Sequence, residues 1–357
     1  MSSCTLHRAT VAIAALLLGL PVSAQTLSVQ APFAPREEPA KTIPVPSTVS
    51  PQMQAIIAQP LRTNWDKPPT TPDGWRQLSD SIATTVAPQI PGMAERMHVT
   101  IEPSTIDGVR VYTITPDDMP TQNRNRLAVH VHGGCYVLNP REAVLPEAIF
   151  LAGFGRMRVI AVDYRMPPEA YFPAALDDAM TVYKAALKTT APRNIAVFGS
   201  SAGGALTLEM MLRAKRDGLP LPGAIAPGTP MSDATKQGDS FQANAMLDNV
   251  LASPDGFCDA ATRFYANGHD LKDPMLSPIY GDVHGFPPTI LTTGTRDLLL
   301  SNTVRMHRAL RQAGVEATLQ VFEGQSHAQF YRDDRIPEVK EAFDEIAGFF
   351  DRHLGQE

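Results

Sequence analysis

Two adjacent serines, Ser200 and Ser201, stand in the run GSSAG at residues 199–203, which fits the pattern G-x-S-x-G. This pattern is typical of a tight turn between a strand and a helix that lifts the central serine oxygen clear of a sheet. Its glycines allow a strained turn and close packing of the helix on the strand. An apolar run precedes the motif and a helical pattern follows it, so its register selects Ser201 as the candidate nucleophile. A flexible turn is the alternative, which the motif alone does not exclude.

A nucleophilic serine needs a base to take its proton and an acid to orient that base. Asp297 ends the strand-like run TILTTGTRD, and His327 follows the strand-like run ATLQVFEG. Because the carboxyl ends of parallel strands meet at one edge of a sheet, we predict Asp297 as the acid and His327 as the base. For Asp297 the alternative is an acid at a helix N-terminus. The histidines in less suitable positions are His269, His284, His307 and His353.

The tetrahedral intermediate of acyl transfer also needs N–H donors for its oxyanion. The run HGGC at residues 132–135 follows the strand-like run LAVHV, where a donor loop of such a site is expected. An ordinary glycine-rich turn is the alternative. His130, on the same strand, is expected to be a packed core histidine, and Arg165 is expected to form a buried ion pair with an acid.

Three motifs together resemble the hormone-sensitive-lipase-like family of α/β-hydrolases, also called bacterial family IV esterases. That family carries HGGG, DYRLAPE-x-x-FPAALDD and G-[DT]-S-A-G-G. This chain reads HGGC at residues 132–135, DYRMPPEAYFPAALDD at residues 163–178 and GSSAGG at residues 199–204. The resemblance extends over roughly residues 50–355, and the combination of motifs is highly specific.

The resemblance implies a serine carboxylesterase that hydrolyses short- to medium-chain acyl esters through an acyl-enzyme, with no cofactor. Carried over by motif, it makes Ser201 the nucleophile, His327 the base and Asp297 its partner. It assigns the oxyanion hole to Gly133, which shapes the loop, and to the N–H donors of Gly134, Cys135 and Ala202. It also favours a homodimer.

Two positions depart from the family pattern. Cys135 stands at the third glycine of HGGG, and Ser200 stands where the family has Asp or Thr. We expect the Cys135 N–H to remain a donor and its thiol to point along the pocket wall as a soft, apolar surface. A bridge to Cys258 is also possible in an oxidising compartment, but two cysteines alone are weak evidence for one.

Strand-like runs alternate with helical patterns along most of the chain, which indicates a mainly parallel eight-stranded sheet with helices on both faces. The fold class is therefore α/β, and the resemblance implies the α/β-hydrolase fold with a helical cap. The strand-like runs are residues 98–104, 109–116, 127–134, 158–165, 194–200, 223–230, 289–297 and 317–324. The main helical patterns are residues 173–188, 202–218, 302–314 and 337–354.

The domain organisation follows from composition and from one connection too long for a simple crossover. We predict a signal peptide, a Pro-rich leader, N-terminal cap helices, a cap insertion and a hydrolase core in two parts. The signal peptide is residues 1–24, the leader 25–49, the N-terminal cap helices 50–95 and the cap insertion 231–286. The two parts of the core are residues 96–230 and 287–357.

The first residues have the pattern of a secretory signal: Arg8, the apolar run of residues 11–20, and small residues at 22–24. We therefore expect a periplasmic or secreted protein, with an uncleaved anchor as the alternative. Cleavage changes the formal charge from −6 to −7, since one Arg is removed. That balance argues against nucleic acid as a partner. No stable membrane insertion of the mature chain is expected, and no metal-ligand spacing is present in the sequence.

The expected partner is a small-molecule ester. An amidase or an acyltransferase would use the same Ser-His-Asp residues and is the alternative among enzymes. A binding module with a degenerate site is the alternative outside enzymes.

Overall fold

A computed structural model of the chain describes residues 37–355. The chain divides after Ile43 into two units, and residues 37–43 of the first contain no helix or strand. The predicted signal peptide lies outside the described residues, as does the leader up to residue 36. The second unit begins at Pro44, and all helices and strands within residues 37–355 belong to it.

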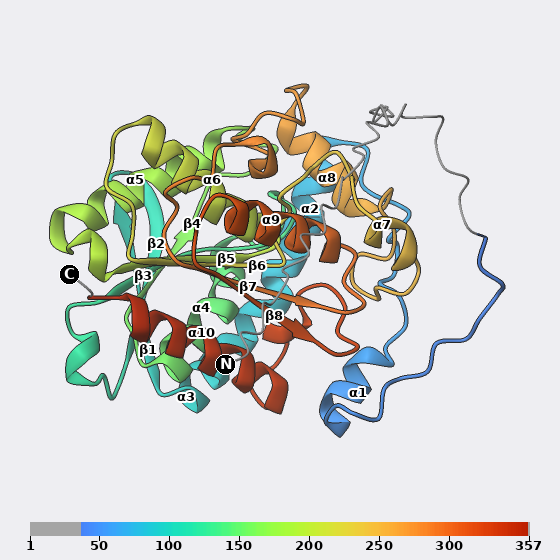
Figure 1. Ribbon diagram of the computed structural model, residues 1–357, viewed down its shortest axis with the longest axis horizontal. Coiled ribbons are helices and arrows are strands. Elements are labelled where there is room, and N and C mark those ends of the chain that lie inside the picture. The colour runs from blue at the N-terminus through green and yellow to red at the C-terminus, as the bar shows by residue number, and fades with distance from the viewer. Residues whose placement is uncertain (1–36, 356–357) are drawn as a thin grey trace, which may run out of the picture. The chain divides into compact units, whose positions relative to one another are not determined.

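The second unit is built on one eight-stranded sheet, with the strand order β1-β2-β4-β3-β5-β6-β7-β8 (Figure 1). The strand β2 is antiparallel to both β1 and β4, and the remaining pairs are parallel. The predicted α/β class and sheet are therefore confirmed. The strands are β1 (Val99–Ile106), β2 (Val109–Pro116), β3 (Leu127–Val131), β4 (Val159–Asp163), β5 (Ile195–Ser200), β6 (Ala224–Gly228), β7 (Thr289–Gly294) and β8 (Ala317–Phe322).

Helices cover both faces of the sheet, and each face has its own apolar core (Figure 1). Successive side chains of β3 point to opposite faces of the sheet, so Val129 and Val131 belong to one core and Ala128 to the other. On the first face lie α5 (Ala174–Thr189), α6 (Ala202–Arg216) and α9 (Leu300–Gln312). On the second lie α3 (Ile90–Arg96), α4 (Leu145–Gly155) and α10 (Pro337–His353).

The helix α4 has no counterpart among the sequence predictions. Its residues Phe150, Leu151 and Ala152 are all fully buried, so no polar face marks a helical period. The Phe150 ring packs edge-on against Phe343 of α10, with 5.7 Å between ring centroids. The helix ends at Arg156, which adopts the left-handed conformation. A helix buried on every side is therefore visible here only through its tertiary contacts.

The two segments expected to form a cap are packed on one another. The N-terminal segment contains α1 (Pro51–Ile57) and α2 (Pro72–Val86), whereas α7 (Ser240–Ala243) and α8 (Phe257–Ala266) lie between β6 and β7. The Trp75 ring of α2 stacks on Phe264 of α8 with 5.8 Å between centroids. The Arg62 guanidinium lies 3.9 Å from the centroid of the Phe257 ring. The boundaries of the cap remain predictions.

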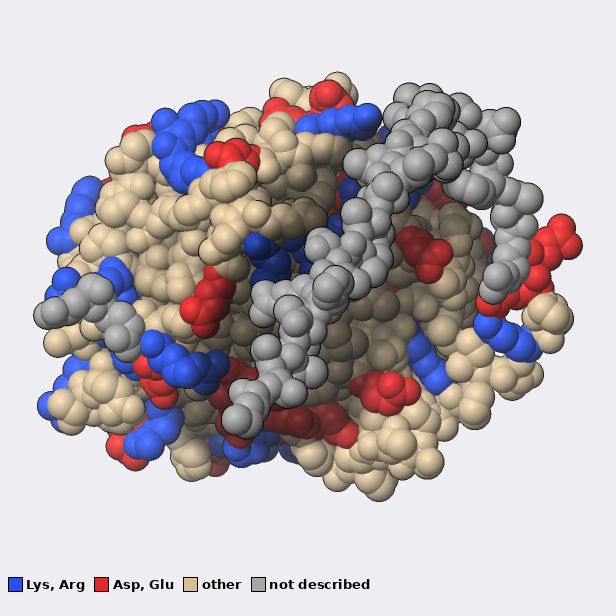
Figure 2. Space-filling model, in the orientation of Figure 1, with Lys and Arg blue, Asp and Glu red and all other residues tan. Residues whose placement is uncertain are grey.

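Charges of both signs are interspersed over the coloured surface in Figure 2. None of the helices within residues 37–355 is long and apolar enough to cross a membrane.

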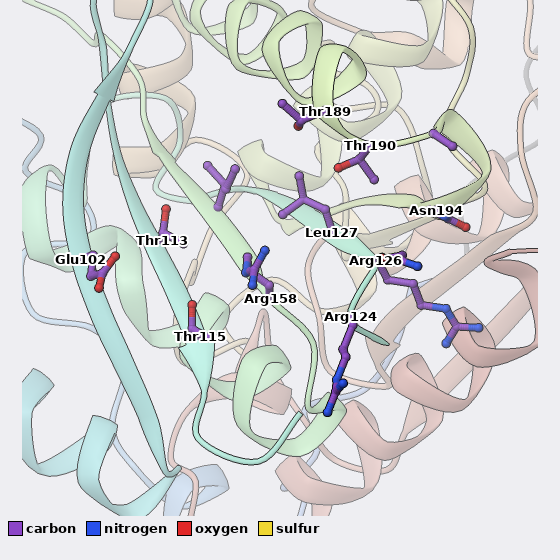
Figure 3. Close-up of a pocket in the computed structure, with 13 residues that line it drawn as sticks. Glu102, Thr113, Thr115, Arg124, Arg126, Leu127, Arg158, Thr189, Thr190 and Asn194 are labelled. Atoms are coloured by element: carbon purple, nitrogen blue, oxygen red, sulfur yellow. The ribbon is translucent and has the colours of Figure 1, made fainter. Parts of the chain in front are cut away.

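A cavity of about 670 Å³ opens at the amino ends of the parallel strands (Figure 3). Leu127 begins β3, Arg158 precedes β4 and Asn194 precedes β5, and all three line it. The serine turn and the glycine-rich loop stand at the opposite, carboxyl ends of these strands. This cavity is therefore not part of the candidate site at the serine turn.

Candidate active site

The turn between β5 and α6 holds Ser201 in a strained conformation, with φ 61° and ψ −122°. Such angles are rare for a residue with a side chain and persist only where the surroundings impose them. The Ser201 N–H donates to the Gly228 carbonyl at 2.9 Å, and the Ser201 carbonyl accepts from the Met231 N–H at 3.1 Å. A Cβ at Gly199 or Gly203 would lie about 2 Å from the Val131 carbonyl oxygen, at 1.9 and 2.0 Å respectively. Both motif glycines are therefore required by the passage of β3.

The two serines of the motif face different surroundings. The Ser200 hydroxyl is fully buried and donates to Oε1 of Glu147 at 2.5 Å. The other oxygen of Glu147 lies 3.1 Å from Nε2 of His130, so His130 is a packed core histidine, as expected. The Ser201 hydroxyl has no hydrogen-bond partner within residues 37–355. Its oxygen is therefore the one free to meet a substrate.

A buried pair of side chains forms between the ends of β7 and β8. Nδ1 of His327 lies 3.0 Å from Oδ1 of Asp297, and both residues are almost inaccessible to solvent. The other carboxylate oxygen accepts the hydroxyls of Thr229 and Thr293, the latter at 3.0 Å. The Leu299 N–H donates to Oδ1 at 2.8 Å. Four donors hold the acid in place, so the orientation of the imidazole is defined.

Its surroundings make His327 easier to protonate than an isolated histidine. Burial lowers the pKa of His327, but the charge and hydrogen bond of Asp297 outweigh it, with a further contribution from Asp248. The pKa of His327 is therefore raised above its ordinary value. Nε2 of the ring has no hydrogen-bond partner among the described residues. That nitrogen is the one available to exchange a proton.

The short segment from Gly228 to Met231 joins the serine turn to the histidine. Its two ends hydrogen-bond the backbone of Ser201, and its Thr229 hydroxyl lies 3.2 Å from Nδ1 of His327. The structure therefore brings Ser201, Asp297 and His327 to one place. It contains no hydrogen bond between Ser201 and His327, and such bonds are often long before substrate binds.

The glycine loop, residues 132–139, packs against the serine turn. A Cβ at Gly133 would lie 2.7 Å from the Ser200 carbonyl oxygen, and Gly134 has a φ of 118° that favours glycine. The Gly134 carbonyl accepts the N–H groups of residues 137 and 138. Within the described chain, the N–H groups of Gly134, Cys135 and Ala202 have no acceptor. Three donors from two loops are thus left free beside Ser201.

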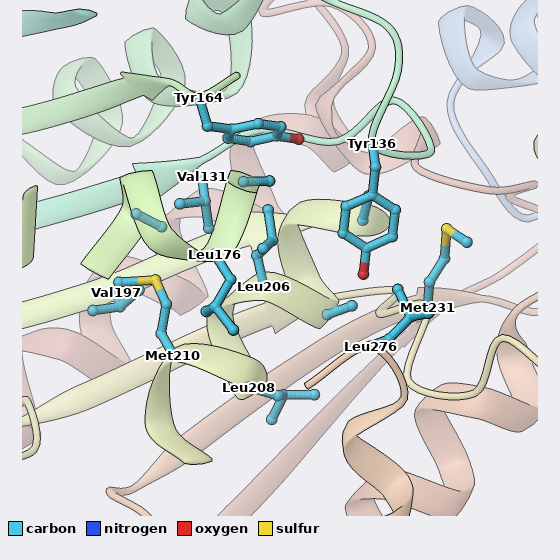
Figure 4. Packing of buried hydrophobic residues seen from close by; sticks show 14 of the residues in the cluster. Val131, Tyr136, Tyr164, Leu176, Val197, Leu206, Leu208, Met210, Met231 and Leu276 are labelled. Carbon is cyan, nitrogen blue, oxygen red and sulfur yellow. The ribbon is translucent and has the colours of Figure 1, made fainter. Parts of the chain in front are cut away.

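The expectation of a free Cys135 thiol on the pocket wall is wrong. Cys135 forms a disulfide with Cys258 of α8, with 5.5 Å between their Cα atoms. The neighbouring Tyr136 belongs to the buried apolar cluster (Figure 4). Its ring stacks on Tyr265 of the same helix, with centroids 4.5 Å apart. The packing of α8 against the glycine loop brings the two cysteines together, and this packing leaves no trace in their spacing of 123 residues.

The other candidate residues take structural roles. Burial lowers the pKa of His132 to about 3, and its ring stacks on Tyr164 at 4.0 Å, so it is neutral. Arg165 does pair with Asp178 at 2.7 Å, but only the acid is buried, since 62% of the arginine side chain is exposed. The four other histidines considered from the sequence have partners away from Ser201: His269 with Ala266, His284 with Asp282, His307 with Ala317 and His353 with Glu316.

One buried acid near the pair was not among the sequence candidates. Asp248 lies in the segment between β6 and β7, and its carboxylate accepts the His327 N–H at 3.2 Å and the Leu298 N–H at 2.8 Å. No motif surrounds it, and its stretch of sequence has only the character of a loop. Sequence reasoning had no signal with which to find it.

A small cavity of about 40 Å³ adjoins the site on the side of α8. Its lining includes Met231, whose N–H bonds to Ser201, and Leu298 and Leu299, which follow Asp297. Polar side chains such as Asp233 and Lys236 share the lining with apolar ones, and Ser201 and His327 do not line it.

The geometry agrees with what the chain resembles. The sequence pattern of a family described as having an alpha/beta hydrolase fold matches residues 128–331, more than half of the chain. The chain belongs to this family. The chain is 29% identical over 301 residues to an esterase of Acinetobacter venetianus, covering 83% of this chain and 93% of the relative. It is 29% identical over 232 residues to an acetyl-hydrolase of Streptomyces hygroscopicus, covering 65% and 77%.

Solved structures give the same result for this α/β-hydrolase. A crystallised esterase superimposes with a TM-score of 0.86 at 43% identity, over 90% of this chain and 99% of that one. A crystallised esterase of the bacterial hormone-sensitive lipase family superimposes with a TM-score of 0.75 at 27% identity, over 86% and 99%. The predicted resemblance to hormone-sensitive-lipase-like esterases is confirmed.

Proposed function

We propose that this α/β-hydrolase is a serine carboxylesterase in which Ser201 is the nucleophile, His327 the base and Asp297 its orienting acid. One observation carries the proposal. A strained serine with a free hydroxyl and a buried His–Asp pair with a free Nε2 share the segment from Gly228 to Met231. The esterases and acetyl-hydrolases among the relatives support ester hydrolysis rather than amide hydrolysis.

In the proposed reaction the Ser201 oxygen attacks the ester carbonyl carbon while Nε2 of His327 takes the hydroxyl proton. Asp297 keeps the proton on Nδ1 pointing toward itself and stabilises the imidazolium. The carbonyl oxygen gains a negative charge and accepts hydrogen bonds from the free N–H groups of Gly134, Cys135 and Ala202. The alcohol leaves with the proton from His327, and water then repeats both steps on the acyl-enzyme.

We further propose a short- to medium-chain acyl preference and an exported protein. The acetyl-hydrolases among the relatives support the first. The disulfide between Cys135 and Cys258 supports the second, because such bonds persist in oxidising compartments. The signal-like residues 1–24 support it independently.

Labelling with a fluorophosphonate, followed by peptide mass spectrometry, tests the proposal. We expect one label, on Ser201, and release of alcohol from a panel of nitrophenyl esters with acyl chains of two to about twelve carbons. The highest kcat/KM is expected at the short end. A protein that neither reacts with the reagent nor hydrolyses any ester of the panel would overturn the proposed function.

A further inference from the structure

The buried Asp248 binds the two loops that carry the acid and the base. Its Oδ2 accepts the N–H of His327 at 3.2 Å and the N–H of Leu298, the residue after Asp297, at 2.8 Å. Its Oδ1 accepts the N–H groups of Val250 and Leu251 at 2.8 and 3.0 Å. One oxygen therefore holds both catalytic loops, and the other anchors them to the segment between β6 and β7.

The next residue, Asn249, extends the connection to the N-terminal segment. Its amide nitrogen donates to the carbonyls of Ile56 and Gln59 at the end of α1, at 3.0 and 3.1 Å. Its amide oxygen accepts from Gln329 at 2.8 Å, and its backbone N–H donates to the Ser326 hydroxyl at 3.2 Å. Ser326 and Gln329 flank His327 in sequence. Asn249 thus links α1 to the loop of the base.

Burial and the neighbouring charge of Asp297 raise the pKa of Asp248, whereas the N–H groups of Leu298 and Leu251 favour its ionised carboxylate. Four backbone N–H groups donate to its two oxygens. A carboxylate that accepts several backbone N–H groups is stabilised in its charged form. The residue is fully buried, so this charge acts through protein rather than through water. Among the described residues, the acids whose charges act on the His327 ring are Asp297 and Asp248.

We propose that Asp248 and Asn249 are positioning residues, through which the cap segments hold the His327 and Asp297 loops in register and place a second negative charge beside the base. The inference rests on the proposed function, since it concerns the residues that hold the proposed base and acid. It assigns the cap a role in the chemistry, in addition to any role in covering the acyl group.

The variant Asp248→Asn tests the proposal because it keeps the shape and removes the charge. In either orientation its NH₂ group faces two backbone N–H groups, so two hydrogen bonds are lost. We expect kcat to fall on the order of 10²-fold, as misplacement of a catalytic group does, with KM for a short ester within about threefold. The acid limb of kcat/KM against pH should move to lower pH, because the imidazolium loses one of its two stabilising charges.

A matched control is Asp273→Asn, since Asp273 also accepts a backbone N–H in the same segment, from Met275 at 2.9 Å, and within residues 37–355 its side chain has no hydrogen bond to either loop. It should keep kcat and the acid limb. A folded Asp248→Asn enzyme whose acid limb does not move contradicts the proposal, whatever its activity.

A second variant, Asn249→Ala, keeps the test decisive if Asp248→Asn does not fold. It removes the link to α1 and to Gln329 but leaves the carboxylate in place. We expect kcat to fall about tenfold or more with an unmoved acid limb, and an unchanged kcat would overturn the proposal. Fluorophosphonate labelling of the wild-type protein distinguishes failure of the proposed function from failure of this inference. No label on Ser201 would refute the proposed function. A labelled wild type, with kcat and the acid limb unchanged in both variants, would refute only this inference.

Discussion

Cys135 of the glycine loop is covalently joined to Cys258 of α8, 123 residues further along the chain. Both sulfur atoms are buried, and Cys135 itself has a φ of 53°. The residue expected to supply one of the oxyanion donors is therefore held from two sides: by the loop that contains it and by a helix of the cap.

Replacing Cys258 with serine should lower both stability and activity. The bridge limits the freedom of the unfolded chain over a long loop, so its loss should reduce the free energy of unfolding by about 2–4 kcal/mol. The glycine loop would also lose its attachment to α8, so kcat should fall more than KM rises. Urea denaturation and steady-state kinetics measure the two effects. Thiol titration of the native wild-type protein provides the control, because finding Cys135 reactive would refute the bridge.

Ser201→Ala and Ser200→Ala should behave differently. Loss of the Ser201 hydroxyl should abolish fluorophosphonate labelling and lower kcat by roughly a thousandfold or more. Ser200→Ala should keep the label but leave an oxygen of buried Glu147 without its donor, which costs about 1–3 kcal/mol of stability. Labelling, kinetics and thermal unfolding of both variants check this. Equal losses of activity in the two variants would mean that the assignment of the nucleophile is wrong.

The pH dependence of kcat/KM should have an acid limb above the ordinary histidine pKa of about 6.5. Burial lowers the pKa of His327, but the charge and hydrogen bond of Asp297 together with the charge of Asp248 outweigh burial and raise it. The neutral imidazole is the active form, so a raised pKa means that activity is lost already at mildly acidic pH. In Asp297→Asn the limb should move to lower pH while kcat falls steeply. A wild-type limb well below pH 6 would be inconsistent with a charged Asp297 beside the base.

Glu209 should make the protein less stable as pH rises. Burial raises the pKa of this α6 carboxyl well above its ordinary value, and its neighbour Tyr136 donates to it at 2.8 Å. The folded chain keeps the proton above pH 4.5 whereas the unfolded chain releases it, so stability declines with pH, by up to about 1.4 kcal/mol per unit.

Glu209→Gln removes this titration. Its free energy of unfolding should lie close to that of the wild type at pH 5 and exceed it increasingly toward pH 8. Urea denaturation at several pH values measures the difference. A difference that stays constant over this range would show that Glu209 does not titrate differently in the folded and unfolded chains.

The sequence by itself determined the sheet and the candidates at its edge. Apolar runs of strand length and helical periods are local features, and the carboxyl ends of parallel strands meet wherever such a sheet forms. Ser201, Asp297 and His327 could therefore be selected from three short stretches. The need for the two glycines around Ser201 could also be predicted from the motif. In the structure, the turn lies too close to β3 to leave room for a Cβ at either position.

The tertiary structure alone decided what surrounds them. The bond of Cys135 to Cys258, the four N–H groups on Asp248 and the burial of α4 on every side all depend on contacts between distant segments. Such contacts follow no period or spacing along the chain, since they arise from how helices distant in sequence pack on the sheet and on one another. The chemistry of the candidate groups was therefore local information, whereas the groups that hold them and set their charge were not.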